Sequence, residues 1–417
     1  MSILTNLTRM WLTRSFKPFI FTNKYSQILD YINCDKLGLY VHIPFCRSIC
    51  NFCPYCKYIY KKDLYNKYVD SLIKEIHLVG NSTFGRKKVT SLYFGGGSPA
   101  MSIERTDEIL DAIYSHFIIT DGMGIELHPD DITDSTMQTL YNLKFTKISV
   151  GIQSFNSKFQ DILKRKEFDS NQIKSVLTNY SFETISIDLI FALPTQTFED
   201  LKSDVEKALA IGANHIAIYP FIDFSFTASN VHAMDNFDKK KLLYNITDYF
   251  YKKGFVRTSI WTFAKSDAIK YSSMTRENFL GFGCSATTLL KEQFKINTFS
   301  INEYCKRIDK DNLPTSLTIN FTRRQRMVYY LFWTAYSTQI NPSDFYNFFG
   351  VTLEQEFGLE IQIAKMLGFI VEDNNIYKMT PKGAFYYHYY ENFYTLSYID
   401  KMWGIMRREA FPDELKL

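Results

Sequence analysis

The most constraining feature of the sequence is a cluster of cysteines. Four of the seven cysteines lie between Cys46 and Cys56, directly after the apolar run Leu37–Ile43, which is predicted to be a strand. Cys46, Cys50 and Cys53 have C-x3-C-x2-C spacing, and three thiolates on one short loop can bind three irons of a 4Fe–4S cluster while the fourth iron stays open. Zinc is the competing interpretation, but zinc sites usually use two separated cysteine pairs, and this chain has no second pair. Buried free thiols are a further alternative, which the clustering disfavours.

The residues around these cysteines point to a known family. The segment Tyr40-Val-His-Ile-Pro-Phe-Cys46, with Phe52 ahead of Cys53, resembles the radical SAM superfamily and, within it, the oxygen-independent coproporphyrinogen III oxidase (HemN-like) family. The resemblance implies that Cys46, Cys50 and Cys53 bind the cluster and that S-adenosylmethionine chelates the open iron. It also implies reductive cleavage of that cofactor to a 5′-deoxyadenosyl radical, and a cofactor contact at Tyr40 and Phe52.

Composition narrows the class of protein. The chain has 417 residues, of which 46% are hydrophobic, enough for a large core, and its net charge of +4 is too small to imply a nucleic-acid partner. No apolar run approaches the ~20 residues that a membrane helix needs. Clustered cysteines fit a reducing compartment, so a cytoplasmic location is predicted. Residues 1–29 contain no acidic residue and several basic ones, and a targeting role for them stays an open alternative.

The middle of the chain alternates short β-type runs with amphipathic helical stretches. Predicted strands cover residues 37–43, 89–94, 124–128, 145–153, 184–191 and 214–221. Predicted helices between them include 63–79, 104–117, 156–166 and 198–211. This βα alternation predicts an α/β fold with a parallel sheet, and the resemblance makes it a partial, open (β/α)6 radical SAM barrel. Functional residues are then expected at the carboxyl ends of the strands.

The C-terminal part differs from the middle of the chain in its composition and in its predicted elements. Residues 312–316 have the composition of a linker, and aromatic-rich helices are predicted over 322–336 and 353–367. A β-hairpin with an Asn374-Asn375 turn follows, and Thr380-Pro381 has the form of a helix start. The expected organisation is an N-terminal extension at 1–35, a barrel at 36–300 and an α-rich, winged-helix-like domain at 301–417 that covers the barrel. The wing carries Glu372 and Asp373, so DNA binding is not expected.

Several polar or glycine-rich motifs follow predicted strands. Gly95-Gly96-Gly97-Ser98 can let a ligand approach the backbone closely, although a tight turn is the plain alternative. Glu126 closes a strand, and Asp188 lies within an apolar strand, where a carboxylate is costly unless it is satisfied. The resemblance implies that Gly96, Gly97, Ser98, Glu126 and Asp188 contact S-adenosylmethionine.

Further cofactor contacts come from the resemblance. Gln153 and Arg165 match cofactor-binding positions, and Arg165 could pair with the methionine carboxylate; alone it would be a solvated helix charge. Ile222 and Thr287 match residues near a second S-adenosylmethionine in some members. Cys284 is expected to be a packed thiol, and His128 is given no role.

The chain also departs from the family pattern. Cys56 stands three residues after Cys53, where the oxidases have a cysteine two residues after the third, and we predict that Cys56 is not a cluster ligand. Tyr271–Asn278 replaces the Asn-x-x-Tyr-Trp segment of heme-chaperone relatives. Three functions stay open: oxidative decarboxylation of a tetrapyrrole, radical methyl transfer as in class C methyltransferases and anaerobic haem-opening enzymes, and non-enzymatic carriage of haem or another cofactor. The expected partners are a tetrapyrrole-type substrate and an electron donor such as flavodoxin or ferredoxin.

Overall fold

Six parallel strands form the centre of the main sheet in the computed structural model, which describes residues 3–82, 85–265 and 277–417. Their spatial order is β11-β10-β9-β8-β6-β2, the reverse of their order along the chain. They are β2 (Leu37–Ile43), β6 (Ser91–Gly96), β8 (Met123–Leu127), β9 (Lys147–Gln153), β10 (Thr184–Phe191) and β11 (His215–Pro220). This arrangement is the one that the βα alternation predicts, and β2 and β10 have the predicted bounds.

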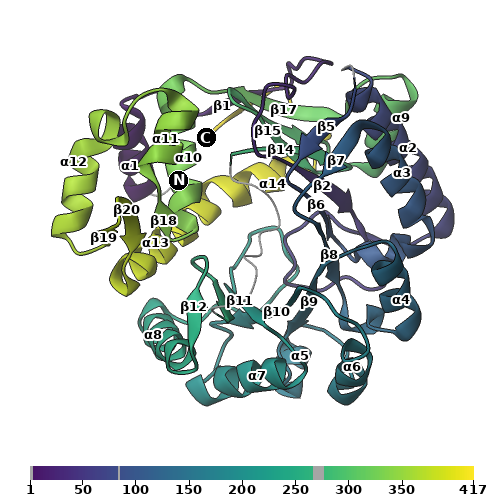
Figure 1. Ribbon diagram of the computed structural model, residues 1–417, viewed down its shortest axis with the longest axis horizontal. Coiled ribbons are helices and arrows are strands. Elements are labelled where there is room, and N and C mark those ends of the chain that lie inside the picture. The colour runs from purple at the N-terminus through teal and green to yellow at the C-terminus, as the bar shows by residue number, and fades with distance from the viewer. Residues whose placement is uncertain (1–2, 83–84, 266–276) are drawn as a thin grey trace.

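Helices cover the outside of this parallel sheet (Figure 1). They are α2 (Lys62–Gly80), α3 (Thr106–His116), α4 (Asp134–Asn142), α5 (Ser157–Ile162), α6 (Ser170–Leu177), α7 (Phe198–Ala210) and α8 (Asn236–Lys252). Local sequence sets their starts: Thr197 and Asp200 form a capping box at the beginning of α7, for example. Helix α5 is shorter than predicted and ends before Arg165, so the cluster Lys164–Lys166 is not helical.

Further strands, most of them antiparallel to their neighbours, extend the sheet at both edges, and the sheet does not close within the described residues. Next to β2 lie β14 (Asn278–Phe282, parallel to β2), β15 (Thr287–Leu289), β16 (Gln293–Asn297), β17 (Thr315–Asn320), β1 (Ile20–Thr22) and β21 (Glu414–Lys416). Beyond β11 lie β13 (Thr262–Lys265) and β12 (Phe255–Arg257). The predicted linker at 312–316 is therefore wrong: Leu313 is buried, and β17 begins at Thr315 inside the sheet.

The C-terminal part has a hydrophobic core of its own, which includes Met327, Tyr330 and Phe345. Its elements are α10 (Arg323–Tyr336), β18 (Gln339–Ile340), α11 (Pro342–Phe349), α12 (Leu353–Met366), β19 (Ile370–Asp373) and β20 (Ile376–Met379). The predicted Asn374-Asn375 turn is confirmed, since both residues have positive φ, 51° and 59°. The chain continues into α13 (Pro381–Tyr394), η3 (Thr395–Ile399) and α14 (Asp400–Met406).

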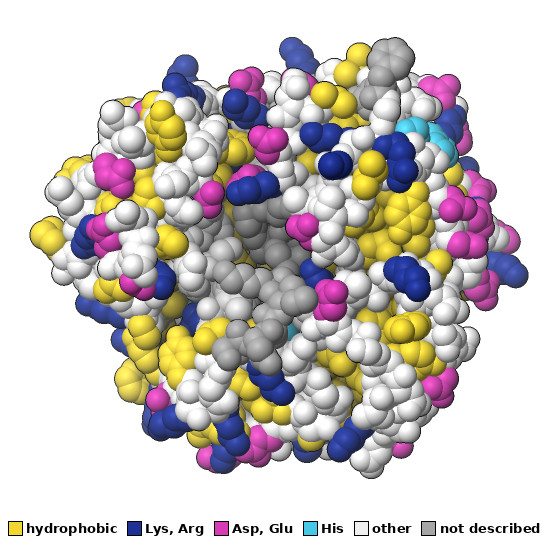
Figure 2. All heavy atoms as spheres, in the orientation of Figure 1, with side chains coloured by type: hydrophobic (Ala, Val, Ile, Leu, Met, Phe, Trp, Pro, Cys, Tyr) yellow, Lys and Arg dark blue, Asp and Glu magenta, His cyan; other side chains and the backbone are white. Residues whose placement is uncertain are grey.

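The ends of the described chain pack together on this side of the molecule. Helix α1 (Ile3–Thr13) lies beside α10, where the Arg324 guanidinium donates to the carbonyl of Leu12 at 2.9 Å. Strand β1 pairs with β17 on one side and with β21 on the other. Figure 2 shows one face of the molecule with charged side chains of both signs dispersed among hydrophobic ones. No helix in the described ranges is both long and apolar enough to cross a membrane.

A buried carboxylate joins the helical layer to the far side of the sheet. Glu75 of α2 accepts hydrogen bonds from the Gly283 N–H (2.7 Å), the Tyr304 hydroxyl (2.6 Å) and the Asn297 amide (2.9 Å). Burial raises the pKa of Glu75 to about 7, although these three donors counteract the shift. The contacts fix the turn after β14 against α2 and α9 (Ile301–Asp309).

We expect Glu75→Ala to destabilise the protein, because three buried donors would lose their acceptor. The expected loss is about 3 kcal/mol, measurable as a lower midpoint in denaturation of the metal-free protein. Glu167→Ala, which removes an exposed carboxylate, is the matched control and should leave the midpoint unchanged. Equal midpoints for the two variants would contradict this role for Glu75.

Candidate functional site

The cysteine loop begins at the carboxyl end of β2. Strand β3 (Phe45–Cys46) pairs with β4 (Tyr58–Ile59), and the Tyr60 N–H donates to the Cys46 carbonyl at 3.0 Å. Between these two strands the chain makes the loop that carries Cys50 and Cys53. The Lys57 ammonium donates to the carbonyls of both cysteines, at 3.3 Å for Cys50. Backbone pairing and one lysine therefore hold three thiols on one loop.

The three thiols line one large cavity of about 720 Å³. Burial, followed by the charges of Cys53 and Cys50, raises the pKa of Cys46 to about 12, so its free thiol is protonated. No three His, Cys, Asp or Glu side chains converge on a single-ion site in the part of the chain that the structure describes. A 4Fe–4S cluster does not require such convergence, because each cysteine binds a different iron.

The glycine loop after β6 packs directly on the cysteine strand. The Gly97 N–H donates to Ile43 O (2.8 Å) and the Ser98 N–H donates to Phe45 O (2.7 Å). A Cβ atom on Gly97 would lie 2.5 Å from Phe45 O and 2.9 Å from the Cys46 sulfur. Glycine is therefore needed for close approach to the cysteine strand, beside the expected approach to a ligand. Gly96, Gly97 and Ser98 also line the cavity.

Asp131, which the sequence analysis missed, ties this loop to the cysteine loop. Its buried carboxylate accepts from the Ser98 hydroxyl (2.7 Å), the His128 N–H (2.9 Å) and the Arg47 guanidinium. Arg47 is next to Cys46 in the chain, and Ser98 ends the glycine loop. The available sequence signal was the position of Asp131 three residues after His128, where it completes a capping box.

Two carboxylates line the same cavity from neighbouring parts of the sheet. Glu126 of β8 accepts from the Gly96 N–H at 3.0 Å, and Asp188 of β10 accepts from the Ser149 hydroxyl at 2.9 Å. Burial raises the pKa of both groups, and burial together with the Glu126 charge raises that of Asp188 to about 7. These hydrogen bonds come from neutral donors, so a cationic ligand would relieve the repulsion between the two carboxylates.

Arg165 supplies a positive charge near the cysteines. Its backbone N–H donates to Gln160 O at 2.9 Å, and its Nη2 is buried without a hydrogen-bond partner. Burial raises the pKa of the Cys50 thiol, and the positive charge of Arg165 counteracts that shift. The alternative of a solvated helix charge is therefore wrong. A buried donor without a partner is suited to an anionic ligand such as a carboxylate.

The remaining predicted site residues fall into two groups. Phe52, Gln153, Ile222 and Thr287 line the cavity, and Gln153 has a left-handed φ of 72° at the end of β9. Tyr40 does not line it: its hydroxyl lies 3.0 Å from His42 Nδ1, and His42 Nε2 lies 3.2 Å from the Cys56 carbonyl. Tyr40 therefore belongs to a buried hydrogen-bond network beneath the cysteine loop. The sequence alone shows only that two polar side chains, Tyr40 and His42, stand in an otherwise apolar strand.

The fourth cysteine of the loop points away from the cavity. The Cys56 sulfur lies 3.7 Å from the sulfur of Cys284 and 3.3 Å from Phe299 O. Both thiols are buried, and neither lines the cavity. Cys284 is thus the packed thiol that we expected.

Aromatic side chains of the C-terminal part form a further part of the cavity wall. They are Tyr329, Phe332, Trp333, Tyr336, Tyr394, Tyr398 and Trp403. The Trp403 ring lies 5.8 Å from that of Tyr55, and the Arg407 guanidinium donates to Pro54 O. Helix α14 therefore contacts the cysteine loop itself. Residues 271–276 of the segment that departs from the heme-chaperone pattern lie outside the described residues.

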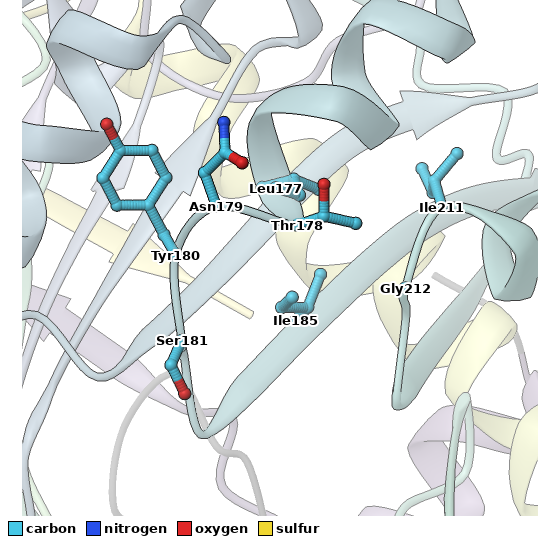
Figure 3. Close-up of a pocket in the computed structure, with 8 residues that line it drawn as sticks. All are labelled: Leu177, Thr178, Asn179, Tyr180, Ser181, Ile185, Ile211 and Gly212. Carbon is cyan, nitrogen blue, oxygen red and sulfur yellow. The ribbon is translucent and has the colours of Figure 1, made fainter.

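A second, smaller cavity of about 370 Å³ lies at the opposite end of β10 (Figure 3). Ile185, near the start of β10, lines it together with Leu177–Ser181 and the Ile211-Gly212 turn. Apart from the Tyr180 phenol, no ionisable side chain among the described residues lines it. The candidate chemistry is therefore confined to the larger cavity.

We expect Asp188→Asn to stabilise the metal-free protein at high pH. An unfolded aspartate titrates near ~4, whereas Asp188 titrates at about 7, so between these values the folded state holds a proton that the unfolded chain has released. The stability contribution of Asp188 therefore falls as the pH rises through this window. Relative to wild type, the free energy of unfolding of the variant should be higher by on the order of 2 kcal/mol at pH 8 and by much less at pH 5.

Thermal denaturation at the two pH values measures this difference. Asp161→Asn, at an exposed position just outside the site, is the matched control and should keep the wild-type pH dependence. A variant at position 188 with the wild-type pH dependence would contradict a raised pKa for Asp188.

Comparisons with known proteins agree with this geometry. Residues 40–208 match the model of the radical SAM superfamily. The heme chaperone HemW of Lactococcus lactis subsp. lactis (strain IL1403) is 29% identical over 296 residues, which cover 67% of this chain and 76% of that protein. The oxygen-independent coproporphyrinogen III oxidase of Helicobacter pylori (strain ATCC 700392 / 26695) is 26% identical over 307 residues, 67% of each chain.

A solved structure supports the same fold. Coproporphyrinogen III oxidase (HemN) from Escherichia coli aligns with a TM-score of 0.76 and 20% sequence identity, over 91% of this chain and 96% of that one. At this identity the likeness concerns the fold, an α/β radical SAM architecture with a helical C-terminal part. The chain therefore contains a radical SAM domain over residues 40–208, has a fold like that of HemN, and is similar in sequence to proteins named oxygen-independent coproporphyrinogen III oxidase and heme chaperone HemW.

Proposed function

We propose that this protein is a radical SAM enzyme that oxidatively decarboxylates a tetrapyrrole-type substrate. The superfamily implies a 4Fe–4S cluster and S-adenosylmethionine. The observation that carries the proposal is that three thiols, two carboxylates and one guanidinium line a single cavity together with a group of aromatic side chains. When bound, the cluster supplies an electron that cleaves S-adenosylmethionine and yields a 5′-deoxyadenosyl radical.

In this proposal each side chain binds the ligand group that its charge suits. Cys46, Cys50 and Cys53 bind the cluster, Glu126 and Asp188 bind the cationic part of S-adenosylmethionine, and Arg165 binds its carboxylate. The donor set fits these groups, because the charges of Asp188 and Glu126 repel each other within one cavity and Arg165 Nη2 has no hydrogen-bond partner. Gly96, Gly97, Ser98 and Gln153 complete the cofactor pocket, and Phe52 packs beside Cys53.

The distribution of charge also suggests how a substrate lies. Among the described residues that line the cavity, the lysine and arginines are Arg47, Lys57 and Arg165, all on the cysteine side. A flat, apolar ring suits the aromatic wall, and a propionate arm would then extend toward the cations. In the decarboxylation, the propionate arm would give up one hydrogen atom to the radical that the bound cofactor supplies. It would then release carbon dioxide and pass one electron to an external one-electron acceptor.

Two other functions have specific support. Ile222 and Thr287, the positions that the resemblance implies for a second S-adenosylmethionine, line the same cavity, which favours methyl transfer as the second candidate. The name of the Lactococcus lactis relative, a heme chaperone, favours a haem carrier as the third. We place the enzyme in the cytoplasm, with flavodoxin or ferredoxin as the electron donor, and expect no nucleic-acid partner.

The cysteine assignment predicts a sharp contrast within one loop. Anaerobically reconstituted wild-type protein should hold about four irons. Cys46→Ala, Cys50→Ala and Cys53→Ala should each lose most of the iron and its visible absorption, because each thiolate binds a different iron. Cys56→Ala is the matched control and should keep the cluster, since the Cys56 thiol packs on Cys284. Loss of the cluster in the control would show that the wrong three cysteines were chosen.

The reaction itself is tested by its products. Reduced, reconstituted protein should form 5′-deoxyadenosine and carbon dioxide from coproporphyrinogen III, without stoichiometric S-adenosylhomocysteine. Equal amounts of S-adenosylhomocysteine and 5′-deoxyadenosine would instead support methyl transfer, because a second S-adenosylmethionine then donates the methyl group. Stable haem binding without either product would support a carrier.

A further inference from the structure

The outer side of the cysteine loop is exposed and combines apolar side chains with positive charge. Ile49 and Ile59 are 48% and 44% exposed, although both are large hydrophobic side chains. The chain contains no acidic residue between Asp35 and Asp63. Lys61 and Lys62, at the start of α2, are exposed and follow Ile59 closely.

Contacts within the protein make these residues one surface. Cys46 pairs with Ile59, and the Tyr60 N–H donates to the Cys46 carbonyl, so the lysines that follow Tyr60 lie next to the cysteine strand. On the other side, the exposed Arg407 reaches Pro54 O, beside Tyr55. We call Ile49, Ile59, Lys61, Lys62 and Arg407 the loop face.

The charge of the loop face is not neutralised within the protein. Lys61, Lys62 and Arg407 take part in none of the ion pairs between described residues. By contrast, the nearby Arg47 forms an ion pair with the Asp131 carboxylate. The neighbouring acids in the chain are Asp63 and Glu409, so the face keeps an excess of positive charge.

We propose that the loop face docks an acidic one-electron carrier protein, which reduces the cluster through the cysteine loop. The inference rests on the proposed function, because reductive cleavage of S-adenosylmethionine needs an external electron. The cavity side of the loop faces the carboxylates and the aromatic wall, so the exposed side of the same loop gives a carrier its direct approach. An apolar centre with a charged rim is the usual composition of a transient protein interface, and opposite charge speeds the encounter.

Charge reversal on the lysines tests the proposal. The double variant Lys61→Glu/Lys62→Glu leaves the cysteines and all residues assigned to the cavity unchanged. With purified flavodoxin hydroquinone at low salt, its rate of 5′-deoxyadenosine formation should fall about tenfold or more below wild type. With dithionite, a small reductant that needs no docking surface, its rate should stay within about twofold of wild type. The defect with flavodoxin should shrink as salt is added.

The matched control reverses two exposed lysines on the outer helices, Lys174→Glu/Lys207→Glu, so that the net charge changes equally. It should behave as wild type with both reductants. A wild-type rate for Lys61→Glu/Lys62→Glu with flavodoxin, an equal loss in the control, or an equal loss with dithionite would each overturn the proposal. Absence of cleavage in wild-type protein with dithionite would instead refute the proposed function.

Discussion

The site depends on the hydrogen bonds that fix the end of β2 between its neighbours. Strand β2 pairs with β6 and β14, and beyond the strand the glycine loop still donates to Ile43 and Phe45. The cysteine loop therefore starts from a fixed point, and the Asp131 carboxylate connects it to the loop after β6 and to the residues after β8. Because parallel strands bring their carboxyl ends to one edge, groups far apart in sequence share one cavity.

Periodicity and turn chemistry were sufficient to predict most of the parallel sheet. Strands β2 and β10 have the predicted bounds, and the Asn374-Asn375 hairpin is confirmed because its two residues tolerate a positive φ. The predictions were wrong where local composition conflicted with tertiary pairing. Residues 312–316 look like a linker, yet Thr315 is paired with Asn297 in the sheet, and the helix expected over 156–166 ends at Ile162.

Only the site residues that stand within a recognisable sequence motif could be predicted from the sequence. Most residues that the resemblance implies for the site line one cavity. Tyr40 does not, because its hydroxyl lies 3.0 Å from His42 Nδ1 inside the fold. Asp131 and Glu75 escaped the analysis because their roles arise from partners distant in sequence, such as Ser98 and Gly283. Apart from the capping-box position of Asp131 three residues after His128, a single sequence gives no reason to prefer these two acids over their exposed neighbours.

The pairing of β1 with β17 and β21 affects the order in which the sheet can form. Residues 20–22 of β1 are synthesised early, but their partners lie near residue 318 and at residues 414–416. During synthesis one edge of β1 must therefore wait until residue 318 has been made, and the other edge until residues 414–416 have been made. Contacts of such large sequence separation form slowly, since a long loop must close before they contribute any stability. The parallel strands, whose partners follow one another along the chain, can assemble first, and the edge that contains β1 completes the sheet last.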